Sequence, residues 1–243
     1  MQTDPKTIKK HFKSSIDKYS EHAVVQKIIA EKLAEELEGS FYEKILELGA
    51  GTGFLTEQLS KKIKFNEYYA NDLVEKSEKF VRKYINDAVF FCGDFRRIKF
   101  NQKFDLIASN AVFQWFENME KVFDYCKNNL KKGGILAFST FSPNNFKEFK
   151  DVSGLGLEYK TANEIIKLLE QNFEIIKCEQ FEKIISFDNP LKILTHMKNT
   201  GVNSLSSKTW SIIKIKNFCN EYSKKYPNLE LTYSPIILVA KLK

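Results

Sequence analysis

The chain has 243 residues, 43% hydrophobic and 28% charged, as expected for a globular protein with one sizeable core. Its net charge of +7 comes from scattered, mostly Lys residues, which favours a solvated surface over a nucleic-acid groove. The four cysteines form no CxxC pair, so neither a metal site nor a disulfide framework is expected. No apolar run approaches a signal peptide or the ~20 residues of a membrane helix, so we expect a protein that is neither exported nor inserted in a membrane. The cysteine usage fits a reducing cytoplasm, and we expect no membrane or nucleic-acid partner.

The first half of the chain alternates between strand and helix patterns. Apolar residues spaced by three to five positions predict a helical arm over residues 1–40. A short apolar run at Lys44–Leu48 predicts the first strand, and helical spacing resumes at Phe54–Ile63 after a glycine cluster. Further strands are predicted at Glu67–Asp72, Ala88–Gly93, Phe104–Asn110 and Ile135–Phe141, helices at Glu75–Tyr84 and Asn118–Leu130, and a turn at Gly133–Gly134. This alternation predicts a parallel sheet covered on both faces.

The second half completes the sheet and adds an insertion. A helix is predicted around Thr161–Gln171, a strand around Phe173–Phe187 and a closing strand around Leu231–Leu242, with a mainly helical segment between those strands. We therefore expect an α/β fold with a doubly wound, mostly parallel seven-stranded sheet. Its single domain would comprise the arm (1–40), a core (41–187), a helical cap (188–228) and a final strand (229–243), and the cap could be a lid over a site.

The strongest motif is the glycine cluster after the first strand. It contains Gly49, Gly51 and Gly53, preceded by Glu47, and opens the predicted helix. Glycines here let the backbone turn sharply and approach a ligand, and Asp72, about 20 residues on, is placed to accept from ribose hydroxyls. The spacing is GxGxG rather than the GxGxxG of nicotinamide sites, and the acidic neighbour suits a cationic sulfonium better than a phosphate. The alternative is a purely structural turn.

Residues after the third and fourth strands are further candidates. The carboxylate of Asp94 could accept from an adenine amine, and Phe95 could cover the ring. Phe113 and Trp115 either shield a reactive methyl group from water or only fill the packing below, and both readings stay open. Two further cofactor candidates are Leu73, directly after the second strand, and Asn110, at the end of the fourth, where open α/β sheets bind ligands.

The combination of ELGAGTG, an acidic residue ending the second strand, Gly-Asp after the third and Gly-Gly before the fifth resembles the class I S-adenosylmethionine-dependent methyltransferases over roughly residues 40–187. Three further stretches resemble the malonyl-acyl-carrier-protein O-methyltransferases of biotin synthesis. They are the segment His11–Leu33, SNAVFQW followed by GGILAFSTFSPNNFKEF, and MKNTGVNSL with LTYSPIILVAKL.

The resemblance implies a Rossmann-like fold, S-adenosylmethionine as cofactor, and a malonyl thioester on acyl-carrier protein or coenzyme A as the acceptor. It implies that Tyr19 closes over the cofactor, making it the one possible catalytic residue, and that the cap covers the substrate. The implied substrate residues are Tyr19, His22, Phe113, Gln114 and Trp115. Many relatives carry an Arg-Phe pair where this chain has Glu158-Tyr159, so the cation that anchors the malonyl group is open, with Lys160 a candidate.

The expected reaction needs no general base, because a malonyl carboxylate with a pKa of about 4 is already ionised at neutral pH. In agreement, no His or Cys constellation is evident. We expect His11, His22 and His196 to be structural or solvent-facing, with His22 the nearest to the site.

Two other functions compete with this interpretation. One is a class I methyltransferase acting on another small molecule, a quinone or RNA. The sequence SNAVFQW, where nucleobase amino-methyltransferases carry a proline-rich turn, counts against amino-group methylation. The other is a non-enzymatic binding domain, which the intact glycines and acidic residues disfavour.

Overall fold

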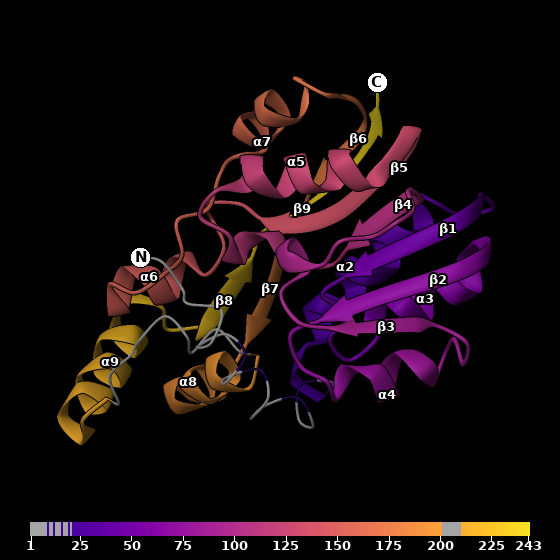
Figure 1. Cartoon of the computed structure of the whole chain (residues 1–243). Helices are drawn as coiled ribbons and strands as arrows, with labels where there is room; N and C mark the ends of the chain where they lie inside the picture. Colours follow the sequence, from indigo (N-terminus) through magenta and orange to yellow (C-terminus); the bar gives the residue numbers. More distant parts are fainter. Residues whose placement is uncertain (1–8, 10–11, 13–15, 17–18, 20, 201–209) are drawn as a thin grey trace.

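The structure is a computed structural model that describes residues 9, 12, 16, 19, 21–200 and 210–243 (Figure 1). Much of the predicted arm, including His11, and part of the predicted cap lie outside the described residues. The helix described in full in the arm is α2 (Val24–Glu35), which begins after Ala23. Within the described residues, no helix is long and apolar enough to cross a membrane.

The main sheet has seven strands in the order β3-β2-β1-β4-β5-β9-β6. Neighbouring strands from β3 to β5 pair in parallel, whereas β9 is antiparallel to both of its neighbours. The strands are β1 (Phe41–Leu48), β2 (Lys64–Asp72), β3 (Val89–Cys92), β4 (Phe104–Ser109), β5 (Leu130–Phe141), β6 (Phe173–Gln180) and β9 (Pro235–Leu242). The predicted doubly wound, mostly parallel seven-stranded sheet is confirmed. The strand order reverses between β1 and β4, where sheets of this kind open a crevice for ligands.

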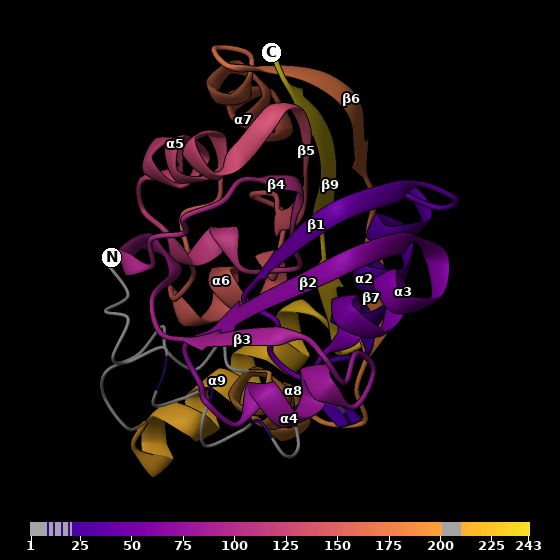
Figure 2. The same ribbon diagram turned by 45° about the vertical axis from the view of Figure 1, so that its right-hand side comes forward.

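Helices cover both faces of the sheet (Figures 1 and 2). On one face lie α2, α3 (Phe54–Lys62) and α4 (Ser77–Arg82), and on the other α5 (Met119–Asn129) and α7 (Ala162–Leu169). Successive residues of β9 enter opposite cores, with Ile237 and Val239 in one and Leu238 and Ala240 in the other. This alternation explains why the strand is apolar almost throughout.

Two predicted strands were wrong in extent, because each divides between two sheets. The segment predicted around Phe173–Phe187 forms β6 and β7 (Lys183–Ser186), and the closing segment forms β8 (Glu230–Tyr233) and β9. β7 and β8 pair antiparallel in a separate two-stranded sheet. The chain changes sheets at Ser234, whose backbone carbonyl accepts from the Ser142 amide at 2.8 Å.

The helical insertion was predicted correctly where it is described. It contains α8 (Pro190–Asn199) and α9 (Ile212–Lys225) and connects β7 to β8. With α6 (Lys147–Ser153), a helix that the sequence did not predict, these elements lie on the side of the main sheet toward which β1, β2 and β3 point (Figure 1). The insertion therefore lies at the end of the sheet where the site candidates were expected.

The predicted turn at Gly133–Gly134 was also wrong. Both residues lie within β5, and Gly133 has a φ of +75°. The pairing of β4 with β5 shifts register next to them, so the glycines absorb an irregularity inside a continuous strand rather than start a new one.

One part of the sheet lacks the helix expected between successive parallel strands. The connection from β3 to β4, which is described in full, contains only the short 3-10 turn η1 (Phe95–Arg97). Aromatic rings cover the sheet there instead, because Phe100 packs edge-on against Phe91 and Phe104 at centroid distances of 5.2 and 5.1 Å.

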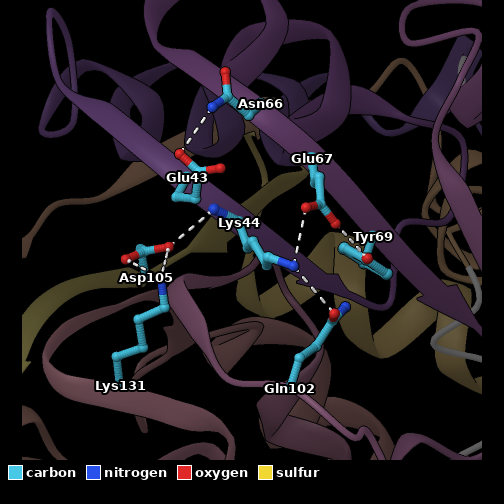
Figure 3. Close-up of polar contacts among 8 residues, drawn as sticks. All are labelled: Glu43, Lys44, Asn66, Glu67, Tyr69, Gln102, Asp105 and Lys131. Atoms are coloured by element: carbon cyan, nitrogen blue, oxygen red, sulfur yellow. Dashed lines mark hydrogen bonds and ion pairs between the residues drawn. The ribbon is translucent and has the colours of Figure 1, made fainter.

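A polar network continues this cover across four strands (Figure 3). Lys44 Nζ lies 2.9 Å from Glu67 Oε1 and donates to Gln102 Oε1 at 3.2 Å. The carboxylate of Asp105 accepts from the backbone amide of Lys44 and from Lys131 Nζ, each at 2.9 Å. The network lies toward the amino ends of the strands, away from the predicted site.

Glu148 on α6, which is 3% exposed, ties this helix to β8, the strand that follows the insertion. Its carboxylate accepts from the Thr232 backbone amide at 2.9 Å and from the Thr232 hydroxyl. We expect Glu148→Ala to lower the free energy of unfolding by about 2 to 3 kcal/mol, because it leaves a buried N–H without an acceptor. Urea unfolding measures this, with exposed Glu158→Ala as the control. Equal effects of the two substitutions would contradict the assigned role.

Candidate active site

A cavity of about 960 Å³ opens at the carboxyl ends of the parallel strands. Most of the predicted cofactor residues line it, although they come from four different strand ends and the arm. They are Glu47, Gly49, Gly51, Asp72, Leu73, Asp94, Phe95 and Asn110, together with Tyr19 and Trp115. Gly53 is not among the described lining residues. Gly53 precedes α3 with a φ of +79°, and a Cβ added there would lie 3.1 Å from the carbonyl oxygen of Phe80. Gly53 is therefore needed for the turn into the helix rather than for contact with a ligand.

The glycine turn is fixed by the end of β2. The backbone amides of Gly49 and Ala50 both donate to the Asn71 carbonyl, at 2.8 and 2.9 Å. A Cβ at Gly49 would lie 2.4 Å from Val112 Cγ2, and its φ of +72° also favours glycine. The close approach of the turn to the loop after β4 therefore requires glycine here.

Asp72 joins the turn to the cavity. Its Oδ2 accepts from the Gly51 amide at 2.9 Å and its Oδ1 from the Val74 amide at 2.8 Å. Burial raises the pKa of this carboxyl group, while these hydrogen bonds oppose the shift. Asp72 also lines the cavity, which places its carboxylate within reach of a ligand hydroxyl.

Glu47 is a second buried carboxylate on the cavity wall, with 1% exposure. Its Oε2 accepts from the hydroxyls of Thr56 and Tyr68, each at 2.6 Å. Burial raises the pKa of Glu47 to about 7, with a smaller contribution from the charge of Asp72 and opposition from the two hydroxyls. Two carboxylates side by side make this end of the cavity suited to a cation.

The side chain of Asp94 is fixed by Arg96, a contact that the sequence did not predict. Arg96 donates to both of its oxygens, at 2.9 Å from Nε and 2.6 Å from Nη2. Burial would raise the pKa of Asp94, but the bonds from Arg96 outweigh it and hold the pKa below its ordinary value. Phe95 beside it is 4% exposed and packs against Phe116 at 5.2 Å.

Both polar atoms of the Asn110 side chain form hydrogen bonds within the protein. Its Nδ2 donates to the Gln26 carbonyl at 3.0 Å and its Oδ1 accepts from the Ser139 hydroxyl at 2.7 Å. The next residue, Ala111, has a φ of +55°, and its amide donates to Ser139 Oγ at 2.9 Å. A left-handed backbone at a residue other than glycine is a strained arrangement that concentrates at functional sites.

A second cavity of about 40 Å³ adjoins the first. The two share part of their walls, formed by Phe12, Tyr19, Gln26, Ala111 and Trp115. The ring of Tyr19 packs against those of Phe12 and Phe54, at centroid distances of 4.9 and 6.2 Å. Burial, together with the charge of Asp72, raises the pKa of Tyr19 well above its ordinary value, so its phenol stays neutral. Tyr19 and Trp115 thus lie at the junction of the two cavities.

The remaining substrate candidates, and His196, differ in whether they reach a cavity. Gln114 lines the second cavity, where its Nε2 donates to the Ala111 carbonyl at 2.6 Å. Phe113 is fully buried and packs against Phe138 at 4.9 Å, so its position fits the packing alternative. His22 is not among the described residues that line either cavity. His196 is buried, with its Nε2 2.6 Å from the Tyr233 hydroxyl, which agrees with a structural role.

Sequence reasoning missed several residues of the second cavity. Gln26 lies on α2, Asn145 just before α6 and Thr200 at the end of α8. Tyr159 was noted only as a departure from relatives, yet its hydroxyl accepts from Asn145 Nδ2 at 3.1 Å and its ring lines the cavity. No local motif marks these positions, because they meet only through the fold. The cation candidate Lys160 lines the first cavity and is not among the described residues of the second.

Comparisons with known proteins identify the family to which the sequence is similar. Residues 46–138 match a family described as a methyltransferase domain. The malonyl-[acyl-carrier protein] O-methyltransferase of Haemophilus influenzae is 33% identical over 98% of this chain and 95% of its own length. The enzyme of the same name from Calditerrivibrio nitroreducens is 35% identical, over 96% of this chain and 95% of its own length.

Solved structures show the same fold. A putative methyltransferase from Bacillus halodurans superposes with a TM-score of 0.63 at 18% identity, covering 87% of this chain and 97% of that one. The N-methyltransferase NodS from Bradyrhizobium japonicum, in complex with S-adenosyl-L-homocysteine, gives a TM-score of 0.54 at 12% identity, covering 87% and 85%.

The raised pKa of Glu47 predicts a pH-dependent stability. Because its pKa in the folded chain, about 7, lies above the ordinary 4.5, the stabilisation is complete below pH 4.5 and is lost as the pH rises through 7. Between pH 5 and pH 8 the free energy of unfolding should fall on the order of 2 to 3 kcal/mol further in the wild type than in Glu47→Gln. Urea unfolding across this range measures the difference. Glu43→Gln, which alters a surface carboxylate on the same strand, is the control, and parallel pH profiles for wild type and Glu47→Gln would refute the prediction.

Proposed function

Because this chain belongs to the malonyl-[acyl-carrier protein] O-methyltransferase family, we propose that it methylates the free carboxylate of a malonyl thioester carried by acyl-carrier protein. The observation that carries the proposal is similarity along nearly the whole chain, which includes the segments that form the second cavity as well as the glycine turn. The product would be the malonyl methyl ester, an early intermediate of biotin synthesis as the sequence resemblance implies.

The first cavity fits S-adenosylmethionine by its size and charge. This cofactor carries a cationic sulfonium, a ribose and an ammonium group but no phosphate, and the cavity wall holds the buried carboxylates Glu47 and Asp72. A dinucleotide would place phosphates near these charges. The Thr52 hydroxyl on the same wall has no partner among the described residues and is a further buried polar atom that a ligand could satisfy.

We assign the binding roles from the positions of the side chains. Asp72 would accept from the ribose hydroxyls, and Glu47 would balance the ammonium group. Asp94, oriented by Arg96, together with Phe95, would border the adenine. When bound, the cofactor supplies an electrophilic methyl group.

The protein would contribute positioning and exclusion of water rather than proton transfer. The acceptor carboxylate is already ionised at neutral pH, so none of the buried tyrosines at the junction needs to act as a base. Tyr19 and Trp115 would hold the acceptor oxygen in line with the methyl group and keep water out. We further propose that arm, core, cap and final strand form one domain, with arm and cap closing over the site, and that the enzyme works in the cytoplasm.

The decisive assay is transfer of labelled methyl from S-adenosylmethionine to malonyl-acyl-carrier protein, with acetyl-acyl-carrier protein as the matched control that lacks a free carboxylate. Label is expected in the malonyl sample alone, as a base-labile methyl ester. Malonyl-coenzyme A in a parallel sample shows whether the carrier protein is required. Label in neither carrier sample, with cofactor binding intact by calorimetry, would refute the proposed acceptor and direct the search to a small molecule, a quinone or RNA.

A further inference from the structure

The second cavity differs from the first in charge. The described residues that line it include no Asp, Glu, Lys, Arg or His, whereas the first cavity is lined by several charged side chains. The imidazole of His196, which is buried, is neutral at neutral pH because burial lowers its pKa to about 4. Within the described chain, a carboxylate that enters the second cavity therefore meets no fixed cation.

The volume of the second cavity suits a carboxyl group. About 40 Å³ is room for roughly three water molecules, which is the number of heavy atoms in a carboxylate. Neutral donors could orient it there. The Tyr159 hydroxyl accepts from Asn145 and so keeps its own proton for donation, and Asn145 is held in turn because its Oδ1 accepts from the Ser234 amide at 3.1 Å.

Two glutamines of the cavity wall carry buried side-chain oxygens. The side-chain oxygens of Gln26 and Gln114 accept no hydrogen bond within the described chain. Gln26 is 5% exposed and lines both cavities, and Gln114 lines the second. Acceptor oxygens of this kind oppose a carboxylate on its own and favour a positive charge at the junction.

We propose that the second cavity is the subsite for the acceptor carboxylate and that, because its described lining offers no cation, the sulfonium of the methyl donor in the adjoining cavity is the counter-ion that holds it there. This inference rests on the proposed function. A bond forms from the carboxylate oxygen to the methyl carbon while the bond from that carbon to sulfur breaks and sulfur keeps the electron pair. The charges of the carboxylate and of the sulfonium both disappear, and no proton is released. The methyl ester is therefore no longer held by the attraction between these two charges.

A binding experiment without turnover tests the inference. Malonyl-acyl-carrier protein is titrated into the full chain saturated either with sinefungin, which carries a protonated amino group in the region of the sulfonium, or with neutral S-adenosylhomocysteine. We expect at least about tenfold tighter binding with sinefungin, because only that complex supplies the positive charge. Acetyl-acyl-carrier protein should bind equally to both complexes. Equal binding of the malonyl carrier to both complexes would overturn the inference and indicate a fixed cation.

A variant with a permanent cation provides an independent check. In Gln114→Lys the ammonium can still donate to the Ala111 carbonyl and adds a charge to the second cavity. This variant should bind the malonyl carrier with S-adenosylhomocysteine nearly as well as with sinefungin. Gln171→Lys, the same substitution at an exposed position on the surface, should behave as wild type, and an unchanged dependence in Gln114→Lys would count against the inference.

Thermal melting and S-adenosylhomocysteine affinity verify that both variants fold. Different results would refute the proposed function and the inference about the counter-ion. A wild-type chain that transfers no methyl group to the malonyl carrier refutes the proposed function. A wild-type chain that transfers it, yet binds the malonyl carrier equally in both complexes, refutes only the inference about the counter-ion.

Discussion

The site depends on how the end of β2 holds the turn after β1. One backbone carbonyl, that of Asn71, receives two amides of the turn, and Asp72 receives a third through its side chain. The turn is thereby brought so close to Val112, after β4, that a side chain at Gly49 would not fit. Because β1 and β4 are neighbours at the reversal of strand order, this contact shapes the floor of the large cavity and presents Asp72 to it.

Charge is distributed unequally over the two cavities that meet at Tyr19 and Trp115. The large cavity carries buried carboxylates, one of them with a pKa near neutrality, and the small one carries neutral hydroxyl and amide groups. A positively charged donor is complementary to the carboxylates of the large cavity, and a negatively charged acceptor in the small cavity is complementary to that donor. A reaction that cancels both charges gains from a dry junction, because water stabilises the separated ions more than the neutral products.

The sequence predicted the sheet, and most of the cofactor candidates that it indicated line one cavity, because both depend on local patterns. The glycine turn, Asp72 at a strand end and the alternation of strands and helices can each be recognised from short stretches of sequence. The divisions at residues 180–183 and at Ser234 could not be predicted, since the strand pattern runs on through the change of sheet. The small cavity was likewise hidden. Gln26, Asn145 and Tyr159 are far apart in the chain, and an uncharged subsite leaves no charge pattern to detect.

The most direct test of the account is a crystal structure of the chain with sinefungin and malonyl-pantetheine, a small mimic of the carrier-bound thioester. The account predicts the malonyl carboxylate in the small cavity, within hydrogen-bonding distance of the Tyr159 hydroxyl and with the positively charged group of sinefungin as its nearest cation. A carboxylate bound instead to Lys160, or to any other cationic side chain of the protein, would contradict it.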